Sequence, residues 1–278
     1  MAGASGNISA PHPDSVWRLI VSGEANGATN MAVDEAILEA VVAGMVPGTL
    51  RFYFWRPPCI SVGYAQPLEE MVNLDLCRRE GVEWVRRPTG GRAILHTDEV
   101  TYSVALRGDD PRVRGDVVTS YRHLSQGLLA GFRTLGLEVV QARLQEQARP
   151  SQSPACFDRP SHYEITCRGR KLVGSAQARR RGAILQHGSI PLRGDVARLV
   201  HYLRMPEEER TALQAKLRQR AITLEEALGR PLPEATVVEA LARGFSEALG
   251  VSLEPAELTA HEWRRAQELR LARYQADT

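Results

Sequence analysis

The sequence lacks two features that direct a protein into or through a membrane, a long apolar run and the apolar core of a signal peptide. No run in its 278 residues approaches the roughly 18 consecutive apolar residues that a membrane-spanning helix needs. Residues 1–14 are small, polar and interrupted by proline, and they contain no apolar core of a signal peptide. We therefore expect residues 1–14 to be a disordered tail, and the protein to be cytoplasmic with no membrane partner.

Cysteine is scarce and follows no pattern. The four cysteines are Cys59, Cys77, Cys156 and Cys167, and they form no C-x-x-C pair and no spacing typical of metal ligands. Free thiols are the expected state in a cytosolic chain of this size, and no metal site is predicted.

Charge of one sign does not dominate the composition. The formal net charge is only +2, so the overall field gives no reason to expect binding to nucleic acid. A hydrophobic fraction of 43% and a charged fraction of 24% are ordinary for a soluble globular protein. The length is sufficient to bury a substantial core, in one large domain or two small ones.

The pattern of apolar residues predicts an α+β fold, with a mixed or antiparallel sheet and flanking helices up to about residue 195. Expected strands cover residues 16–21, 50–55, 59–64, 82–85, 92–96, 100–106, 163–167, 171–178 and 183–190. Expected helices are a segment capped at Thr29 or Asn30 that ends near Gly44, residues 68–80, and a segment from Tyr121 to Gly136.

The part of the chain after Asp195 has a different character. Strand patterns nearly vanish, and charged helical segments are predicted over residues 207–228, 234–249 and 255–274. We expect a main domain over residues 15–250 and a helical C-terminal extension over residues 251–278. The protein is expected to be a monomer.

A Gly-Gly turn flanked by arginines is the first candidate binding site. The residues involved are Arg86, Arg87, Thr89, Gly90, Gly91 and Arg92. Glycine lets backbone amides approach a ligand closely, and amides exposed in such a turn can hold a phosphate or carbonyl oxygen. The arginines add charge-assisted donors. A plain β-turn with solvated arginines is the alternative interpretation.

Cys156 is the candidate nucleophile. It lies in a loop rich in serine and proline, residues 151–160, and not in an apolar periodic segment. A thiol becomes a reactive thiolate when a nearby cation lowers its pKa, and Lys171, at the start of an expected strand, is the candidate cation. An incidental free thiol is the alternative. The other three cysteines fall within strand or helix patterns and are expected in the core.

Two histidines lie beside glycine-containing segments. His96 ends a strand after the Gly-Gly turn, and His187 precedes Gly188. Either could orient a substrate, or be a core histidine with satisfied hydrogen bonds. Asp34 is more typical of a helix-start carboxylate than of a catalytic one. The arginines at 179–181 are expected in a solvated turn, with a docking patch for an acidic protein as the alternative.

Four segments together resemble the biotin/lipoate protein ligase and octanoyltransferase superfamily. They are residues 30–36, 86–96, 169–177 and 185–189, in the family's order and at family-like spacing. Lipoate ligases of this superfamily usually carry a third glycine where Arg92 stands, and no nucleophilic cysteine at the position of Cys156. The Gly-Gly-Arg sequence and the cysteine are instead similar to the LipM-type octanoyltransferases.

This resemblance implies a function and a set of site residues. The fold would be that of the biotin/lipoate ligase catalytic domain. Cys156 would form a thioester with an octanoyl group taken from acyl carrier protein, and Lys171 matches the family lysine held to lower the pKa of the cysteine. The group would pass to a lysine of a lipoyl domain, with the H protein of the glycine cleavage system as the expected acceptor. The implied substrate-binding residues are Arg86, Arg87, Thr89, Gly90, Gly91, Arg92, His96, Gly174, Ser175, Ala176 and His187.

Thioester exchange followed by attack of an amine needs no ATP, so no cofactor is expected. Two other enzymes on the same scaffold remain open: an ATP-dependent lipoate ligase, and an amidotransferase that moves octanoyl groups from the H protein to other lipoyl domains. A non-catalytic, lipoate-responsive regulator is a third alternative. It would need a helix-turn-helix segment or a basic face for DNA, and neither is evident in the sequence.

Overall fold

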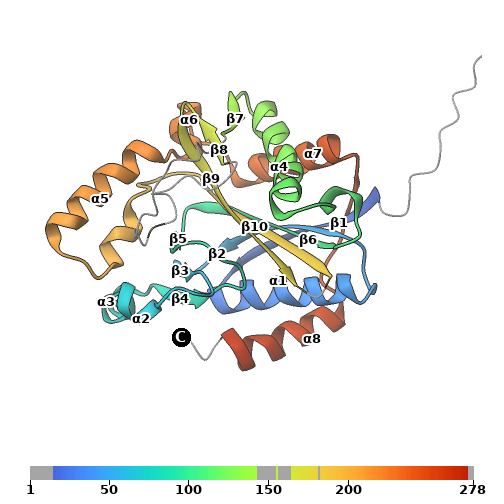
Figure 1. Ribbon diagram of the computed structural model, residues 1–278, viewed down its shortest axis with the longest axis horizontal. Coiled ribbons are helices and arrows are strands. Elements are labelled where there is room, and N and C mark those ends of the chain that lie inside the picture. Colours follow the sequence, from blue (N-terminus) through green and yellow to red (C-terminus); the bar gives the residue numbers. More distant parts are fainter. Residues whose placement is uncertain (1–14, 143–154, 156–163, 181, 275–278) are drawn as a thin grey trace, which may run out of the picture.

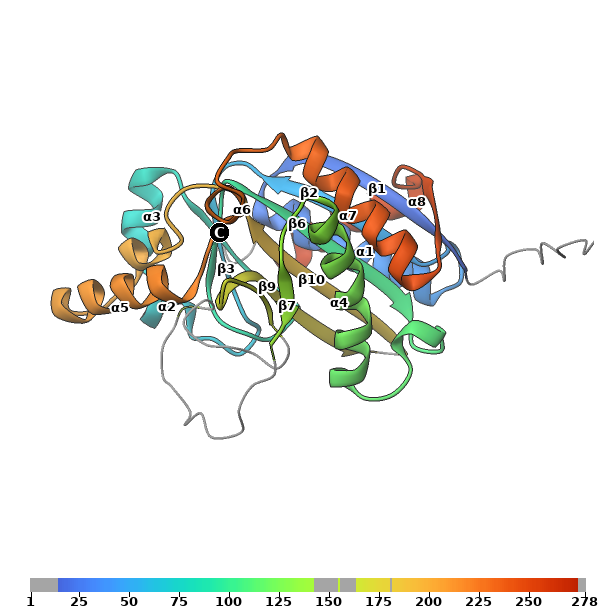
Figure 2. The ribbon, with the colours of Figure 1, turned by 90° about the horizontal axis from the view of Figure 1, so that it is seen from above.

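A computed structural model describes residues 15–142, 155, 164–180 and 182–274. Within these residues an eight-stranded mixed sheet lies between two pairs of helices (Figure 1, Figure 2). Helices α1 and α8 cover one face of the sheet and helices α4 and α7 cover the other. The predicted α+β class, with a mixed sheet and flanking helices, is therefore confirmed.

The main sheet has the strand order β11-β1-β2-β6-β10-β9-β8-β7. Strand β1 pairs in parallel with β11 and with β2, and the other neighbours are antiparallel. The central strands β2, β6 and β10 are buried almost throughout, because helices cover both faces. The strands are β1 Val16–Ala25, β2 Thr49–Trp55, β6 Glu99–Arg107, β7 Val139–Gln141, β8 Ile165–Cys167, β9 Arg170–Arg180, β10 Ala183–Pro191 and β11 Ser252–Pro255.

A second, smaller sheet has the order β4-β3-β5. Its strands are β3 Cys59–Val62, β4 Glu83–Arg86 and β5 Ile94–His96, with β3 parallel to β4 and antiparallel to β5. Pro57 and Pro58 separate β3 from β2, because proline has no backbone N–H to continue a strand ladder. The Gly-Gly turn connects β4 to β5, as the sequence predicts.

Eight α-helices occur in the described ranges: α1 Gly27–Val42, α2 Leu68–Met71, α3 Leu74–Glu80, α4 Val117–Thr134, α5 Glu207–Arg220, α6 Leu224–Leu228, α7 Glu234–Leu249 and α8 Ala260–Leu269. A short π-helical turn, Arg270–Tyr274, follows α8. None of the helices in this part of the chain has the length and apolar character to cross a membrane.

Several helix boundaries differ from the predicted ones, and asparagine caps account for two of them. Helix α1 begins before Thr29, because the side chain of Asn26 caps it by accepting a hydrogen bond from the Thr29 amide at 2.9 Å. The helix predicted over residues 68–80 is two helices, since Asn73 starts a new one by accepting from the Leu76 amide at 3.1 Å. In both cases an asparagine ahead of the expected position supplies the cap. Helix α4 also begins before Tyr121, the segment predicted over residues 207–228 is the two helices α5 and α6, and α8 begins only at Ala260.

Strands β7 and β11 were not predicted. Strand β7 is three residues long, and β11 is mostly exposed and lies where only helices were expected. Both are at the edges of the main sheet, where a short strand buries few side chains and shows little apolar periodicity. The segment expected as a C-terminal extension thus adds β11 to the main sheet and α8 to the α1 layer.

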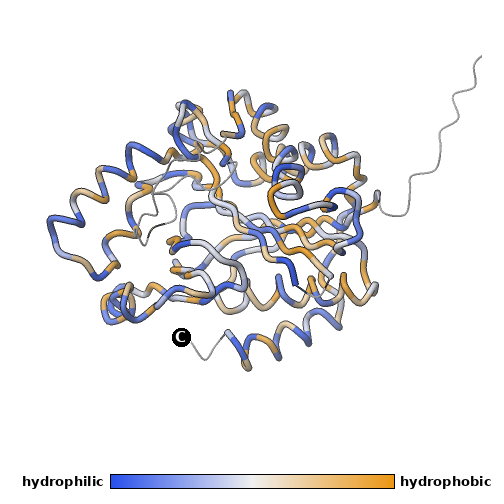
Figure 3. The backbone as a smooth tube through the Cα atoms, viewed as in Figure 1, coloured by the Kyte–Doolittle hydropathy of each residue, from blue (hydrophilic) through white to orange (hydrophobic). Residues whose placement is uncertain are grey.

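The apolar core occupies both faces of the main sheet. One cluster, between the sheet and α4 and α7, includes Phe132 and Phe245. A second, between the sheet and α1 and α8, includes Met31 and Ile37. Figure 3 shows α5 as largely hydrophilic, while the central strands carry much of the hydrophobic colour.

Candidate active site

A cavity of about 220 Å³ lies between the two sheets, with α1 forming part of its wall. Its lining draws on β2, β3, β5, β6, β9, β10 and the Gly-Gly turn. Nine of the residues predicted from the sequence line it: Arg87, Gly91, Arg92, His96, Lys171, Gly174, Ser175, Ala176 and His187. Segments that are far apart in the chain therefore meet around one cavity.

Strands β9 and β10 form one wall, and the side chains of Ser175 and Tyr102 fill the space beside Gly188. A Cβ atom there would be 2.4 Å from the Ser175 hydroxyl oxygen and 2.6 Å from the Tyr102 ring. The Tyr102 hydroxyl donates a hydrogen bond to the Ser175 Oγ at 2.9 Å. This close approach fixes the position of Ser175 in the cavity wall and requires glycine opposite it.

Arg87 holds the Gly-Gly turn in place. It is 4% exposed, and its guanidinium donates to the carbonyl oxygens of Gly90 at 2.8 Å and Arg92 at 2.8 Å. Gly91 has φ of +94°, a conformation that favours glycine. A Cβ atom at Gly63 would meet the Gly91 carbonyl oxygen at 2.2 Å, so two glycines allow the turn to pack against β3.

Three of the predicted residues do not line the cavity. Arg86 turns to the loop after β3, where its guanidinium donates to the Gln66 carbonyl oxygen at 2.7 Å. The Thr89 hydroxyl is buried against Nε2 of His187 at 2.6 Å. Gly90 presents its carbonyl oxygen to Arg87. Thr89 and Gly90 thus support the lining residues from behind.

Lys171 lines the cavity as an ion pair. Its Nζ lies 2.5 Å from Oε1 of Glu164, and the side chains are only 4% and 3% exposed. A buried ammonium needs such a partner, because desolvation of an unpaired charge costs several kcal/mol. Sequence reasoning missed Glu164, whose position before β8 carries no motif of its own.

Cys156, the predicted nucleophile, lies outside the described residues. Its neighbour Ala155 is described, and it is buried at 1% exposure. Ala155 forms a parallel β-bridge with Ala93, which is flanked by the cavity-lining residues Arg92 and Ile94. Ala155 itself lines a neighbouring pocket of about 40 Å³, which shares Ile94 and Ser189 with the cavity, so the chain passes close to the cavity wall at residue 155.

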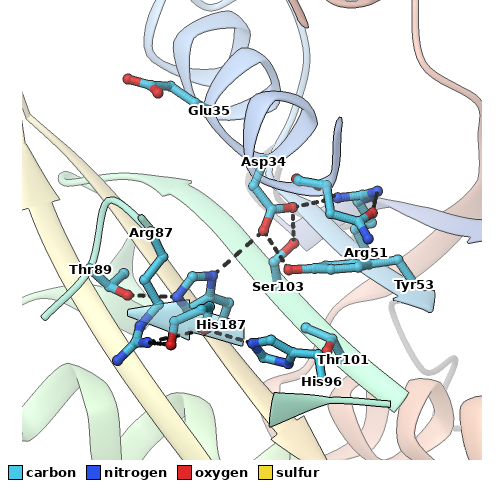
Figure 4. Close-up of polar contacts among 12 residues, drawn as sticks. Asp34, Glu35, Arg51, Tyr53, Arg87, Thr89, His96, Thr101, Ser103 and His187 are labelled. Atoms are coloured by element: carbon cyan, nitrogen blue, oxygen red, sulfur yellow. Dashed lines mark hydrogen bonds and ion pairs between the residues drawn. The ribbon is translucent and has the colours of Figure 1, made fainter. Parts of the chain in front are cut away.

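Asp34 organises a buried polar cluster beside the cavity (Figure 4). Its carboxylate accepts hydrogen bonds from Arg51 at 2.8 Å, Tyr53 at 2.9 Å and Ser103 at 2.8 Å. His187 approaches from the other side, with Nδ1 at 3.7 Å from Oδ2. The prediction that Asp34 is a helix-start carboxylate is wrong, because it lies on the buried side of α1 in the second turn.

Burial and charge act in opposite directions on this cluster. Burial raises the pKa of Asp34, but the charge of Arg51 and the hydrogen bond with His187 outweigh it, so the pKa is lowered overall. Burial lowers the pKa of His187, and the charge of Arg87 adds to this, although Asp34 opposes it. Asp34 is therefore ionised and His187 neutral near pH 7.

His96 is the centre of a second polar cluster, which shares the cavity wall. Its Nδ1 lies 2.7 Å from Oε1 of Glu99, and its Nε2 lies 2.7 Å from the Ser61 hydroxyl oxygen. The Trp55 ring stacks on the imidazole, with 3.9 Å between ring centroids and 8° between planes. Figure 4 shows His96 and His187 on the same side of the Asp34 cluster.

Several polar residues of these clusters escaped the sequence reasoning: Ser61, Glu99, Arg51, Tyr53, Ser103 and Ser189. They sit within strands, where a single polar residue reads as a solvent-facing position. The sequence did offer one signal, which is that several polar residues lie within otherwise apolar strands. Charged residues such as Arg51 and Glu99 are rarely buried without a partner, so their presence there indicates a buried polar cluster.

The three described cysteines are free thiols in the core, as predicted. Burial raises the pKa of Cys77 to about 11 and that of Cys59 well above its ordinary value. The thiols of Cys59 and Cys77 are therefore protonated and unreactive at neutral pH. Among the described residues no group of three or more His, Cys, Asp or Glu side chains is arranged to hold a metal ion.

Comparison with known proteins gives consistent relatives. A family model described as the lipoyl protein ligase A/B catalytic domain matches residues 26–246. The chain is 48% identical over 267 residues to the octanoyltransferase LipM of Kyrpidia tusciae, covering 94% of this chain and 97% of the relative. It is 47% identical over 266 residues to the octanoyltransferase LipM of Moorella thermoacetica, covering 95% and 97%.

Solved structures of similar fold carry lipoate protein ligase names. The bi-partite lipoate protein ligase of Thermoplasma acidophilum superimposes with a TM-score of 0.77 at 28% identity, covering 92% of each chain. Lipoate-protein ligase A bound with ATP superimposes with a TM-score of 0.75 at 27% identity, covering 92% of this chain and 95% of the other.

Proposed function

The chain belongs to the lipoyl protein ligase A/B catalytic domain family and is an octanoyltransferase of lipoate biosynthesis, and from this premise we propose that it carries the octanoyl group as a thioester on Cys156. The donor is octanoyl-acyl carrier protein. The acceptor is a lysine of a lipoyl domain, with the glycine cleavage H protein first among the candidates. Both partners, and the reaction, belong to the cytoplasm.

The observation that carries this proposal is the buried cation at the cavity wall. Lys171 is held as an ammonium by Glu164, and the chain passes close to the wall of the same cavity at Ala155. A fixed positive charge favours a thiolate over a thiol. The ammonium of Lys171 is therefore assigned to stabilise the Cys156 thiolate.

The two half-reactions follow from thioester chemistry. The Cys156 thiolate attacks the donor carbonyl, the bond to the carrier's thiol breaks, and that thiolate takes a proton. The acceptor amine then attacks the new thioester and releases Cys156. The first step exchanges one thioester for another, and the second forms a more stable amide, so no nucleotide is consumed.

The cavity residues divide into two groups in this proposal. One wall of the cavity is formed by residues with small side chains, which leave room for an unbranched acyl chain: Gly174, Ser175, Ala176 and Gly188. The amide of Gly91, the glycine of the turn that lines the cavity, is assigned to the oxyanion that forms at the carbonyl, a contribution of about 3–4 kcal/mol for one donor in other enzymes. Arg87 fixes the turn, and His187 borders the cavity beside it.

The direct test is a mass measurement. After incubation with octanoyl-acyl carrier protein, the protein gains the mass of one octanoyl group, and peptide mapping places it on Cys156. The Cys156→Ala variant gains none and transfers no octanoyl group, whereas Cys77→Ala, a matched cysteine buried in α3, still acquires it. Full turnover by Cys156→Ala excludes the thioester.

Two measurements distinguish this function from the other two enzymes considered on the same scaffold, namely the requirement for ATP and the preferred octanoyl donor. Strict dependence on ATP, with an acyl-adenylate intermediate, identifies a ligase instead. Faster transfer from an octanoylated H protein than from acyl carrier protein identifies an amidotransferase. The Lys171→Gln variant is expected to react with iodoacetamide at Cys156 only at higher pH, because the stabilising cation is gone.

A further inference from the structure

The hydrogen bonds around His96 show how its two ring nitrogens are used in the neutral ring. Glu99 accepts from the hydroxyls of Thr101 and Ser189 and lies 2.7 Å from Nδ1 of His96. An ionised carboxylate can only accept, so Nδ1 carries a proton and donates it to Glu99. Nε2 of the neutral ring is then an acceptor, and the Ser61 hydroxyl, at 2.7 Å, donates to it.

Arg87 completes this arrangement from the other side of Ser61. Its Nη1 donates to the Ser61 hydroxyl oxygen at 3.1 Å, so that oxygen accepts from a cation while its proton points to His96. In the neutral ring, the basic nitrogen Nε2 therefore faces the Ser61 hydroxyl.

Charged groups of both signs face His96. Glu99 of β6 lies against Nδ1, and the stacked Trp55 ring of β2 fixes the plane of the imidazole. Arg87 after β4 lies beyond Ser61, and His187 of β10 interacts with His96. Lys171 of β9 lines the same cavity. The net arrangement is a base with an acidic orienting partner.

Lys171 is poorly suited to act as this base. Its Nζ is 2.5 Å from the Glu164 carboxylate, and both groups are almost fully buried. An ammonium that donates to a buried carboxylate is stabilised in its charged form. The acceptor lysine also arrives as an ammonium, and it must lose a proton before it can attack a thioester. The reaction therefore needs a proton acceptor other than Lys171.

Resting on the thioester function above, we propose that His96 is the general base of the second half-reaction and receives the proton of the acceptor ammonium through the Ser61 hydroxyl. The ammonium passes one proton to Ser61, while the Ser61 proton moves to Nε2 of His96. The free amine forms an N–C bond with the octanoyl carbonyl, and the C–S bond to Cys156 breaks. The second proton of the nitrogen goes to the departing sulfur, and the imidazolium returns its proton to solvent.

The test separates the two half-reactions in the full-length protein. Octanoyl-enzyme is formed from octanoyl-acyl carrier protein, isolated, and mixed in single turnover with one of two amines. N-acetyl-lysine amide is an ammonium at neutral pH and needs a base, because a lysine amine has a pKa of about 10.4. Methoxyamine is already unprotonated and needs none.

The His96→Gln variant keeps a polar side chain that cannot accept a proton. We expect transfer to N-acetyl-lysine amide to slow by about 100-fold or more, the usual contribution of a general base. Transfer to methoxyamine and the octanoylation of Cys156 are expected to change little. Ser61→Ala is expected to show the same selective loss to a smaller extent, because water can replace a hydroxyl relay.

His201→Gln is the matched control. His201 also faces a carboxylate, with Nε2 at 3.0 Å from Glu80, but its side chain is 53% exposed and outside the cavity. This variant is expected to transfer to both amines at the unmodified rate.

Two outcomes overturn the inference: an unchanged rate with N-acetyl-lysine amide in His96→Gln, or an equal loss with both amines, which indicates a structural role. If no octanoyl adduct forms on Cys156 of the unmodified protein, the thioester function itself fails.

If His96→Gln does not fold, the pH dependence of deacylation of the unmodified octanoyl-enzyme tests the proposal instead. A deacylation rate with N-acetyl-lysine amide that levels off well below the pKa of the amine supports an enzymic base. A tenfold rise for each pH unit overturns it.

Discussion

Asp34 illustrates how a single buried carboxylate can organise the wall of a binding cavity. It accepts from the side chains of Arg51, Tyr53 and Ser103, on two neighbouring strands, and faces His187 on a third. Each of these groups would be costly to bury alone. Together they satisfy one another, and they fix the orientation of His187 at the cavity.

Replacing Asp34 by asparagine is expected to destabilise the fold by about 3–5 kcal/mol, because Arg51 is left as a buried charge without its ion-pair partner. Chemical denaturation measures this difference in unfolding free energy. A loss below 1 kcal/mol contradicts the central place given to Asp34.

The contribution of Asp34 also depends on pH. Its pKa in the folded protein is lowered, so its stabilisation is present above the ordinary aspartate pKa of about 3.9 and is lost as the pH falls toward the folded value. The difference in stability between the unmodified protein and Asp34→Asn should be constant from pH 7 to 5. It should shrink below about pH 4, and a constant difference down to pH 2 disagrees with this assignment.

At the scale of elements, the contact between α4 and α7 depends on missing side chains. A Cβ atom at Gly244 of α7 would lie 2.2 Å from the Gly131 amide nitrogen and 2.4 Å from the Gly127 carbonyl oxygen of α4. Both helix backbones would have to move apart to admit a methyl group. The two helices cover one face of the main sheet, so their separation would disturb a whole layer of the core.

Gly244→Ala is therefore expected to lower the free energy of unfolding by about 1–3 kcal/mol, the cost of overpacking. This loss occurs although alanine favours a helix over glycine by about 1 kcal/mol. Gly23→Ala is the control, because nothing lies within 4 Å of its added Cβ atom. Thermal or urea denaturation of both variants gives the comparison, and equal stability of the two would refute the close contact.

At the scale of the whole molecule, a buried ion pair joins the first strand of the described chain to its last α-helix. Arg18 of β1 donates to Glu262 of α8 at 2.6 and 3.0 Å, and Glu262 is fully buried. Glu262 also completes a capping box with Thr259 at the start of α8. The C-terminal helix is thus attached to the first strand of the main sheet by charge as well as by packing.

Glu262→Gln is expected to cost about 3–5 kcal/mol, since Arg18 is left unpaired in a buried position. The control is Glu247→Gln, which removes an exposed partner of Arg243 and should cost less than about 1 kcal/mol. Denaturant unfolding compares the two. Limited proteolysis of Glu262→Gln should release α8 first, and cleavage elsewhere would argue against this role.

Local patterns predicted most elements well. Helix α7 runs over Glu234–Leu249, the residues predicted as a charged helical segment, and the central strands begin and end within a few residues of prediction. Edge strands β7 and β11 were not predicted, because they bury too few side chains to show an apolar pattern. The roles of the carboxylates Glu99 and Glu164 were not predicted for another reason, since the pairing of strands determines which side chains they contact.

The order of strands and helices, the Gly-Gly turn and the four family segments were determined by the sequence itself, because each depends on neighbours along the chain. Only the tertiary structure decided which polar side chains meet. Lys171 pairs with Glu164, Asp34 pairs with Arg51, and His96 contacts both Glu99 and Ser61. A buried charge is stable only beside a partner of opposite sign or a hydrogen-bonding group. The folding of distant segments around one cavity determines which partner that is.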